Sequence, residues 1–284
     1  MAVLSRTGGN TVFGVDCALF TVDSNELVGY LQNASLRISR NVYRAGGTMD
    51  MDTWARHGPG SATLEATTVL TSLGAPLMAY ALSNSEWAFD AVLRHARTGT
   101  NYAGHFLVTE GRINVTRDAA TESVTALLQG QLTASAPAAS SAPTPRGNYD
   151  KTLYGRDITS LVIGSDDYVN LYEEFSITTT IETADNHAVL DAYQFPLQVG
   201  GRRTVITASR IVEAPAKTPA HSLYWSQLQL AGSPVAFTAI LGSTTIGSTA
   251  CRITDVTWEH GGEGAQRETI TLETDLPATI ETGA

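Results

Sequence analysis

Apolar residues recur at every second position in several short segments of this chain. Within Ala34–Ser39, the residues Ala34, Leu36 and Ile38 are apolar and the residues between them are polar. Successive side chains of a β-strand point to opposite faces, so this alternation predicts a strand with one buried face. The same alternation predicts strands over Arg112–Thr116, Val124–Gln129, Phe175–Glu182, Thr204–Thr207 and Glu268–Thr274. Because long helical periodicity is scarce, the chain is predicted to be mainly β.

One segment has the features of a helix. Ser85 can cap a helix that runs from Glu86 to His95, and Gly99 ends it. Glu86 lies in the first turn, and Arg94 and His95 lie in the last, which suits the helix dipole. We therefore expect one helix here, packed on one face of the sheet.

A stretch rich in Ala, Ser and Pro divides the chain near its midpoint. Residues 134–148 read ASAPAASSAPTPRGN, with three prolines among small residues. Such a composition cannot bury enough apolar surface to fold by itself, so it predicts a linker. The expected organisation is a first β domain over residues 1–133, a linker over 134–150 and a second β domain over 151–284.

The two halves match each other faintly when one is laid over the other in a fixed register. Phe20–Ser24 then lies over Leu161–Ser165, and Leu64 lies over Val205, with no gap between residues 20 and 70. Few residues are identical, but the phase of the alternation is kept. A slip of one residue would turn every buried side chain of a strand outward, so a kept phase indicates an internal duplication.

Beyond residue 70 the two halves differ. The first half has the helix predicted above, whereas His221–Leu228 in the second half is more typical of a strand. Both halves then close with two alternating strands joined by a polar turn, at Arg117–Glu122 and at Glu259–Gly264. A further turn is expected at Gly200–Arg203.

The charge of the chain limits the classes of partner. The formal net charge is −10 over 284 residues, and Lys151 and Lys217 are the only lysines. Such a surface repels nucleic acid, which argues against a DNA-binding protein but not against a conduit through which DNA slides. Met1–Asn10 is polar and glycine-rich, and no apolar stretch approaches the length of a membrane span. Neither a secretory signal nor a membrane partner is therefore expected.

The chain lacks the short motifs that usually mark catalytic or metal sites. No HExxH, GxSxG, P-loop or GxGxxG string is present, and no two histidines are spaced as close metal ligands. Cys17 and Cys251 lie far apart and are predicted to be buried thiols. We therefore expect no enzyme activity, no cofactor and no metal site. The six histidines are His57, His95, His105, His187, His221 and His260.

Three other patterns have structural explanations. Asp50–Trp54 resembles the DxDxT string of phosphoaspartyl phosphatases, but its threonine comes one residue early and no βαβ pattern follows, so a polar loop is predicted. Asp166–Asp167 and Glu173–Glu174 are neighbouring carboxylates, and neighbours on a strand point to opposite faces. Four tryptophans are spread along the chain and are predicted to anchor a core or an interface. They are Trp54, Trp87, Trp225 and Trp258.

In this pattern of elements each half resembles the tail tube proteins of long-tailed bacteriophages. That family has β-sandwich or partial-barrel domains with one flanking helix, a long loop after the second strand and a closing pair of alternating strands. The second half departs from the family by lacking a clear helix. The matching segments are the loops Asn41–Gly60 and Thr183–Gly201, the helix Glu86–Arg97, and the closing pairs Arg112–Thr133 and Arg252–Thr274.

The resemblance implies a homotrimeric ring with pseudo-sixfold symmetry, because a duplicated subunit replaces two of the six single-domain subunits of the family's rings. Six domains of four strands would close a barrel of about 24 strands and about 45–50 Å diameter, at ~4.8 Å spacing and ~40° tilt. Such rings stack into a tube that conducts duplex DNA without binding it specifically. The implied location is the virion tail, after synthesis in the host cytoplasm. The implied partners are further copies of the chain and the tape-measure, terminator and distal-tail proteins.

The polar positions of the alternating strands are candidates for a wall that faces solvent, either in the lumen or outside. They are Ser35, Arg37, Ser39, Ser176, Thr178, Thr180, Glu182, Glu268 and Glu273.

Three alternatives stay open at this point. The chain could form another trimeric ring of the same tail, such as a baseplate hub or a distal-tail component. It could be a two-domain β-sandwich adhesin or carbohydrate-binding protein that uses Tyr224 or Trp225. It could also be an enzyme whose catalytic groups converge only in the fold.

Overall fold

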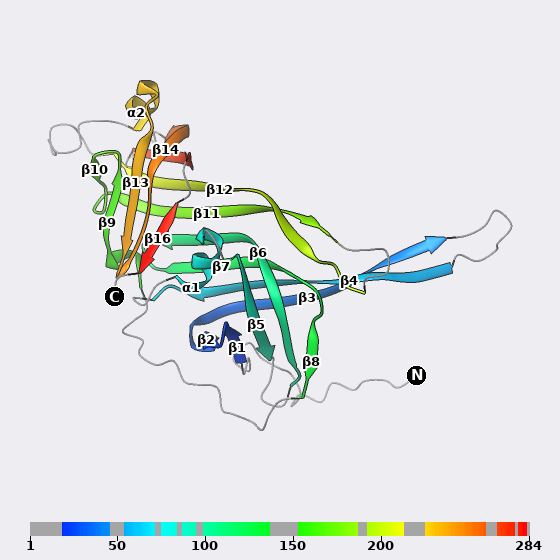
Figure 1. Cartoon of the computed structure of the whole chain (residues 1–284). Coiled ribbons are helices and arrows are strands. Elements are labelled where there is room, and N and C mark those ends of the chain that lie inside the picture. The colour runs from blue at the N-terminus through cyan, green and yellow to red at the C-terminus, as the bar shows by residue number, and fades with distance from the viewer. Residues whose placement is uncertain are drawn as a thin grey trace.

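The computed structural model confirms a mainly β chain, built from long antiparallel strands (Figure 1). The structure describes residues 19–45, 54–71, 75–83, 87–94, 99–136, 153–186, 192–212, 225–259, 266–275 and 278–282. The linker predicted over residues 134–150 falls mostly outside these ranges, so the domain boundaries stay a prediction.

The same series of elements occurs twice along the chain. The first half contains β1 (Leu19–Val22), β2 (Asn25–Glu26), β3 (Leu31–Ala45), β4 (Trp54–Val69), α1 (Pro76–Leu82), β5 (Ala88–Arg94), β6 (Asn101–Thr116), β7 (Ala120–Leu128) and β8 (Thr133–Ser135). The second half contains β9 (Ile158–Ile163), β10 (Asp166–Asp167), β11 (Tyr172–Asp185), β12 (Pro196–Ile211), α2 (Trp225–Ala231), β13 (Val235–Leu241), β14 (Thr244–Glu259), β15 (Arg267–Thr274) and β16 (Thr279–Thr282). Short 3-10 helices lie at Val28–Tyr30 and Gly155–Asp157.

The strand pairing repeats as well. In the first half β1 pairs with β2 and β5, β6 pairs with β5, β7 and β8, and β4 pairs with β3 and β7. In the second half β9 pairs with β10 and β13, β14 pairs with β13, β15 and β16, and β12 pairs with β11 and β15. The internal duplication suggested by the sequence is therefore present in the topology of the described strands.

The repeat extends to the register of the hairpins. A bulge follows Leu31 in β3 and Tyr172 in β11, and the overlay of the two halves places these two residues together. Leu31 pairs with Thr68 of β4, whereas Tyr172 pairs with Arg210 of β12 and not with Ser209, which the overlay would place over Thr68. The second hairpin is thus longer by one residue. Val42 pairs with His57 as Thr183 pairs with Gln198, so the extra residue lies between Gln198 and Arg202 of β12, and the overlay without a gap is wrong from Gly60 onward.

The same correction applies to β4 from Gly60 onward and to β12 from Arg202 onward. Leu64 corresponds to Ile206 rather than to Val205, because these residues pair with the equivalent positions Leu36 and Ile177.

One broad sheet runs through both halves. Its strands follow the order β3, β4, β7, β6, β11, β12, β15 and β14, so that each half supplies a block of four among the described strands. The N-terminal part of β6 leaves this sheet and pairs with β5 and β8, and the N-terminal part of β14 likewise pairs with β13 and β16. Figure 1 shows these smaller sheets turning away from the broad one.

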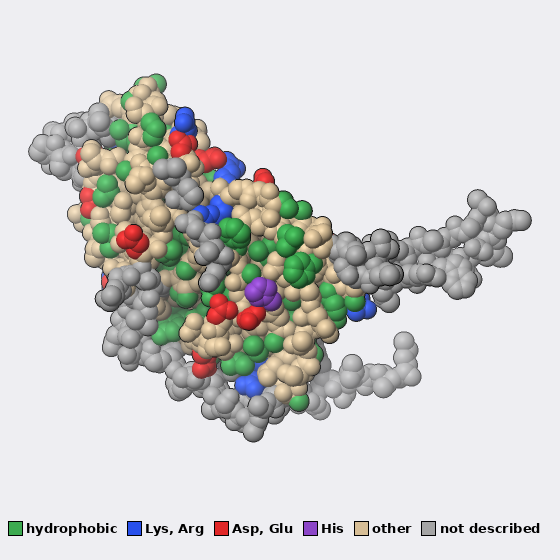
Figure 2. Space-filling view, in the orientation of Figure 1, with side chains coloured by type: hydrophobic (Ala, Val, Ile, Leu, Met, Phe, Trp, Pro, Cys, Tyr) green, Lys and Arg blue, Asp and Glu red, His purple; other side chains and the backbone are tan. Residues whose placement is uncertain are grey.

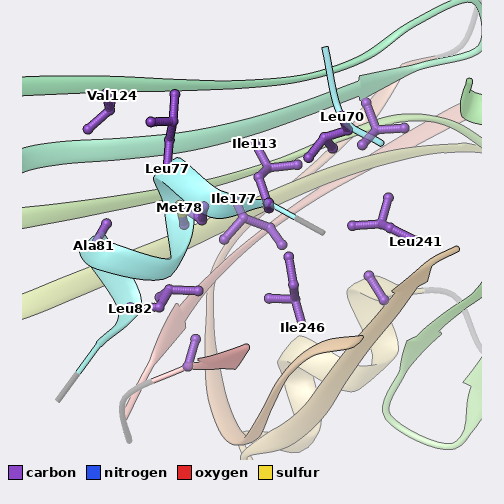
Figure 3. Close-up of a cluster of buried hydrophobic side chains, with 14 of the residues drawn as sticks. Leu70, Leu77, Met78, Ala81, Leu82, Ile113, Val124, Ile177, Leu241 and Ile246 are labelled. Atoms are coloured by element: carbon purple, nitrogen blue, oxygen red, sulfur yellow. The ribbon is translucent and has the colours of Figure 1, made fainter. Parts of the chain in front are cut away.

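The core lies between the broad sheet and α1 and is shared by both halves (Figure 3). Met78 and Ala81 of α1 are fully buried, as are Ile113 of β6 and Ile177 of β11. The helix approaches β6 so closely that a Cβ added to Gly111 would lie 2.5 Å from the Cβ of Ala81. Only glycine therefore fits at that position without moving the helix.

The helix predicted over Glu86–His95 is wrong, because Ala88–Arg94 forms the strand β5. Phe89, Ala91 and Leu93 are buried in strand alternation, and β5 pairs with both β1 and β6. Pairing on both sides outweighs the local helix signals. The helix of the first half is instead α1, upstream of that segment.

Further corrections concern the second half and the predicted loops. The segment His221–Leu228, expected to favour a strand, contains the start of α2. Gly200–Arg203 lies inside β12 and is not a turn. The loops expected at Asn41–Gly60 and Thr183–Gly201 are largely strand, since β3 with β4 and β11 with β12 form long hairpins. Figure 1 shows the hairpin of β3 and β4 projecting beyond the rest of the sheet.

The closing pairs are antiparallel as predicted, through β6 with β7 and β14 with β15. The first turn is shorter than the predicted Arg117–Glu122, because β7 begins at Ala120. The second predicted turn, Glu259–Gly264, lies outside the described residues except for Glu259, the last residue of β14.

Candidate assembly site: a sheet seam and two matching edges

The two halves join edge to edge where β6 pairs with β11. The antiparallel ladder runs from Glu110 opposite Thr180 to Thr116 opposite Glu174. Within it Ile113 lies directly opposite Ile177, and both side chains are fully buried. We call this ladder the internal seam. It buries apolar side chains on one face of the sheet and leaves polar side chains on the other.

The repeat supplies a second copy of each strand of the internal seam. β3 corresponds to β11, and within the described chain it pairs only with β4. β14 corresponds to β6, and along Asp255–Glu259 it pairs with β15 on one edge, while no described strand lies along the other. The outer edges of β3 and of this part of β14 are called the matching edges below.

Bulges fix the correspondence between β6 and β14. Thr109 is the extra residue where β6 pairs with β7, and Thr254 is the extra residue where β14 pairs with β15. The hydroxyl of Thr109 donates a hydrogen bond to the carbonyl of Thr125 at 3.0 Å, and that of Thr254 donates to the carbonyl of Thr271 at 3.2 Å. When the two bulges are aligned, Trp258 corresponds to Ile113.

Large apolar side chains are exposed at the matching edges. Trp258 is 60% exposed, although its counterpart Ile113 is fully buried in the internal seam. Ile38 on β3 is 57% exposed, and its counterpart Thr179 is fully buried. Exposed apolar side chains often mark an interaction site. Trp258 and Ile38 lie on the two edges where the repeat predicts a further paired strand.

The helices show the same difference. Leu230 is the sixth residue of α2, as Ala81 is of α1. Leu230 is 87% exposed, whereas Ala81 is fully buried beside the internal seam. The apolar helix position that lies against the internal seam in the first half is therefore exposed in the second.

A buried carboxylate anchors each helix from the closing strand beside it. Glu122 of β7 accepts hydrogen bonds through Oε2 from the backbone N–H groups of Leu77 and Met78, each at 3.1 Å. The hydroxyl of Thr68 donates to its other oxygen at 3.1 Å. Burial raises the pKa of Glu122 from 4.5 to about 7, although the three hydrogen bonds oppose the shift.

The corresponding carboxylate in the second half is Glu268. Its Oε1 accepts a hydrogen bond from the backbone N–H of Ser226 at 2.9 Å. Arg210 occupies the place of Thr68 and forms a buried ion pair with Glu268 at 2.7 Å. The guanidinium carbon of Arg210 also lies 4.6 Å from the ring centre of Tyr168 and 4.4 Å from that of Trp225.

The prediction that Glu268 faces solvent is wrong, because its side chain is only 1% exposed. A signal was present in the sequence, since Glu268 shares the alternation phase of Ile270 and Leu272. Glu122 likewise shares the phase of its apolar neighbours in β7. A carboxylate in a buried phase indicates a polar partner inside the fold.

The opposite face of the broad sheet is polar, as predicted for most of its candidates. Ser35, Arg37, Ser39, Thr180 and Glu182 are exposed. Ser176, Thr178 and Glu273 are partly exposed. Charges are paired on this face, with Arg203 of β12 to Glu273 of the neighbouring β15 at 2.7 Å and Arg267 of β15 to Glu173 of β11, across β12, at 2.6 Å. In the view of Figure 2, charged side chains are scattered singly or in small groups among uncharged ones.

The chemical candidates of the sequence do not come together in the described part of the chain. No group of three or more His, Cys, Asp or Glu side chains that could hold a metal ion occurs among the described residues. Asp167 accepts hydrogen bonds from two backbone N–H groups and from Ser160, and so stabilises a turn. Asp50–Thr53 and Cys17 lie outside the described residues, and Cys251 is buried as predicted.

An exposed polar pair lies on the first half, and an open hollow lies between this half and β12. His105 Nδ1 is 2.8 Å from Oδ1 of Asp90, and both side chains are largely exposed. The hollow, of about 450 Å³, lies beside this pair and is lined by Trp87, His105, Gln129 and Gln198, among others. Trp225 is fully buried, so it cannot present its ring to a glycan. Among the described helices, none is long and apolar enough to cross a membrane.

Comparison with known proteins finds distant structural similarity alone. No family model and no curated protein matches the chain. A chain from the virion of a native gene transfer agent particle is similar over 43% of this chain and 96% of its own length, with 15% sequence identity and a TM-score of 0.35. A TM-score of this size does not establish a shared fold, so the proposals below rest on the geometry of the sheet.

Proposed function

We propose that this protein is a structural subunit of a phage-type tail tube, in which three copies close a ring and rings stack into a DNA conduit. The observation that carries the proposal is the broad sheet, in which two equivalent blocks of four strands are joined edge to edge. The described chain already contains one such junction, between β6 and β11, and the same junction between successive copies would continue the sheet around a ring. It acts without catalysis or a cofactor.

The size of the wall suits this function. Three copies of eight strands would give a barrel of about 24 strands, which at ~4.8 Å spacing and ~40° tilt is about 45–50 Å across. That diameter leaves a water-filled channel wide enough for duplex DNA. Closure also removes sheet edges that would otherwise pair without control.

The polar face of the broad sheet is assigned to the channel, because the other face is covered by α1 and the core. Its exposed side chains include Ser39, Thr180 and Glu182, and it carries no lysine within the described strands. The arginines Arg203 and Arg267 are paired with the carboxylates of Glu273 and Glu173. Arg37 and Arg112 are also exposed on this face, but the two ion pairs and the acidic side chains reduce its attraction for phosphates, so DNA would pass without sticking.

The long hairpins are assigned to contacts between successive rings. β3 with β4 projects beyond the sheet in Figure 1, and the hairpin of β11 with β12 carries the exposed apolar residues Phe195 and Val199. In the assembled particle the other partners would be the tape-measure, terminator and distal-tail proteins. The protein would then reside in the virion tail after synthesis in the host cytoplasm.

Electron microscopy of the purified protein, with light scattering across concentrations, tests the proposal. Trimeric rings that stack into tubes are the expected result. Rings that never stack would indicate a hub or distal-tail component instead of a tube subunit. A monomer that persists at high concentration would overturn the proposal.

A further inference from the structure

We propose that the β3 edge of one copy pairs antiparallel with the β14 edge of the next, in the register that β11 has on β6. This inference rests on the proposed function and names the contact by which copies join. The partner is a second copy of this chain. β11 pairs with β6 in the internal seam, β14 is the counterpart of β6, and β3 is the counterpart of β11. The β3 edge of another copy is therefore the strand expected to fit the β14 edge.

The register follows from the two correspondences. The hairpin bulges align Tyr172 of β11 with Leu31 of β3, and the closing-pair bulges align Thr109 of β6 with Thr254 of β14. Applied to the internal seam, these two alignments define an external seam between two copies. Its opposed pairs are Ser35 with Glu259, Leu36 with Trp258, Arg37 with Thr257, Ile38 with Val256 and Ser39 with Asp255.

The apolar residues of the external seam fall on one face. Leu36 would meet Trp258 and Ile38 would meet Val256, all on the side where the internal seam buries Ile113. Trp258 and Ile38 are the residues whose exposure the single chain leaves unexplained. A slip of one residue would bring the polar positions of β3 opposite Trp258, so the apolar pattern excludes that slip, and the aligned bulges fix the register itself.

The polar face of the external seam is complementary in charge. Arg37 would lie opposite Thr257, with Asp255 and Glu259 as its diagonal neighbours on the same face. Diagonal positions across an antiparallel pair are within reach of a long side chain. The β3 edge thus brings a cation to the place where the β14 edge has two carboxylates.

The helix α2 adds a third contact. In the first half α1 packs against β6 and contacts β11, and Ala81 lies against Gly111 of β6, which pairs with Thr179 of β11 in the internal seam. The equivalent neighbour of α2 would be β3 of the next copy, and Leu230 is the side chain it would cover. The contact uses different surfaces on the two copies, and such a contact generates a ring when its rotation closes.

Cysteine cross-linking of the full chain tests the register. In a background with Cys17→Ser and Cys251→Ala, the variant with Ser39→Cys and Asp255→Cys places two thiols directly opposite each other. Opposed residues lie about 4.5–5.5 Å apart between Cα atoms, which suits a disulfide. The matched control combines Ser39→Cys with Glu259→Cys, whose thiol lies about 13 Å further along the strand.

Oxidation with copper phenanthroline should convert most of the first variant into covalent trimers on a non-reducing gel and leave the control mainly as single chains. A mixture of the two single-cysteine chains should give dimers only. Rings or tubes in which both variants cross-link equally, or neither does, would overturn the external seam while the proposed function stands. The absence of any assembly by microscopy would overturn both.

Discussion

Glu122 and Glu268 are equivalent residues of the two repeats, and each is a buried carboxylate that accepts hydrogen bonds from the first turn of a short helix. The first N–H groups of a helix have no partner within the helix, and the N-terminal end attracts negative charge. The anchor is the same in both halves, but its polar partner differs. Thr68 donates to Glu122, whereas Arg210 is paired with Glu268. The two carboxylates should therefore respond differently to substitution.

The first prediction concerns the dependence of stability on pH. The pKa of Glu122 is about 7 in the folded chain, and its ordinary value of 4.5 applies to the unfolded chain. A raised pKa means that the folded state binds the proton more tightly, so this contribution to stability is complete below pH 4.5 and is lost as the pH rises to about 7. At about 1.4 kcal/mol per pKa unit, the loss is about 3 kcal/mol.

Glu122→Gln should remove this dependence. The amide oxygen can still accept from the backbone of α1, and the amide N–H group can donate to the hydroxyl of Thr68. Urea denaturation of wild type and variant at pH 5 and pH 8, at equal states of assembly, measures the effect. The variant should gain stability relative to wild type at pH 8, and parallel pH profiles for the two proteins would contradict the prediction.

The second prediction concerns the buried ion pair. Glu268→Gln leaves the guanidinium of Arg210 buried without its carboxylate, which should reduce the unfolding free energy by roughly 3–5 kcal/mol. Replacing both residues, with Arg210→Met and Glu268→Gln, removes the stranded charge and should be less destabilising than Glu268→Gln alone. Thermal and urea denaturation measure both variants.

The exposed pair Arg203–Glu273 is the matched control for this experiment. It joins the same two strands at the same 2.7 Å distance, but water reaches both side chains. Glu273→Gln should therefore change the unfolding free energy by no more than about 1 kcal/mol. Equal losses for Glu268→Gln and Glu273→Gln would contradict the role given to burial.

Much of the fold could be predicted from the alternation of apolar residues. Strands over Ala34–Ser39 and Phe175–Glu182 were predicted correctly, and the overlay of the two halves matches their observed equivalence. Alternation reports which side chains face a core, and this depends on local geometry alone. The equivalence from Gly60 onward could not be predicted, because Val205 is apolar like Ile206 and conceals the shift of one residue.

The helices could not be placed from the sequence for a different reason. Ala88–Arg94 has local features of a helix, yet it pairs with strands on both sides as β5. Trp225–Ala231 is short and lacks acidic residues in its first turn, because Glu268 from a distant strand takes that role. Both outcomes depend on contacts between residues far apart in the chain, which a pattern of neighbours does not contain.

The matching edges could also not be recognised from sequence alone. Trp258 occupies an apolar phase of β14, and the sequence predicts it as an anchor for a core or an interface. Its exposure shows that the core of the described chain does not cover it, and the repeat shows which buried residue it replaces. That comparison requires both halves of the fold.

The third prediction follows from the place of Trp258. Trp258→Lys would put a charge in the apolar face of the external seam, so it should lower the assembled fraction at least tenfold while leaving the single chain folded. Trp258→Phe keeps an apolar ring and should assemble nearly as wild type. Sedimentation measures assembly, and circular dichroism measures folding.

The control for this experiment is Thr159→Lys, which adds the same charge at an exposed position of β9, away from the matching edges. It should assemble as wild type does. Equal loss of assembly in both lysine variants would show that the added charge, and not the position of Trp258, is responsible.

The fourth prediction concerns the polar face assigned to the channel. Thr178→Lys and Thr180→Lys together would place two lysines per chain on that face, near the middle of the broad sheet. Each lysine that contacts a phosphate releases counterions, so assembled tubes of this variant should retain duplex DNA at low salt and release it as salt rises. Wild-type tubes should retain little DNA under any of these conditions.

A variant with Thr159→Lys and Asn170→Lys carries the same added charge at exposed positions outside that face, and it should leave DNA free to pass through the tube. If short DNA enclosed in the tubes is retained equally by both variants, measured by filter binding after nuclease treatment, then the Thr178 face does not line the channel.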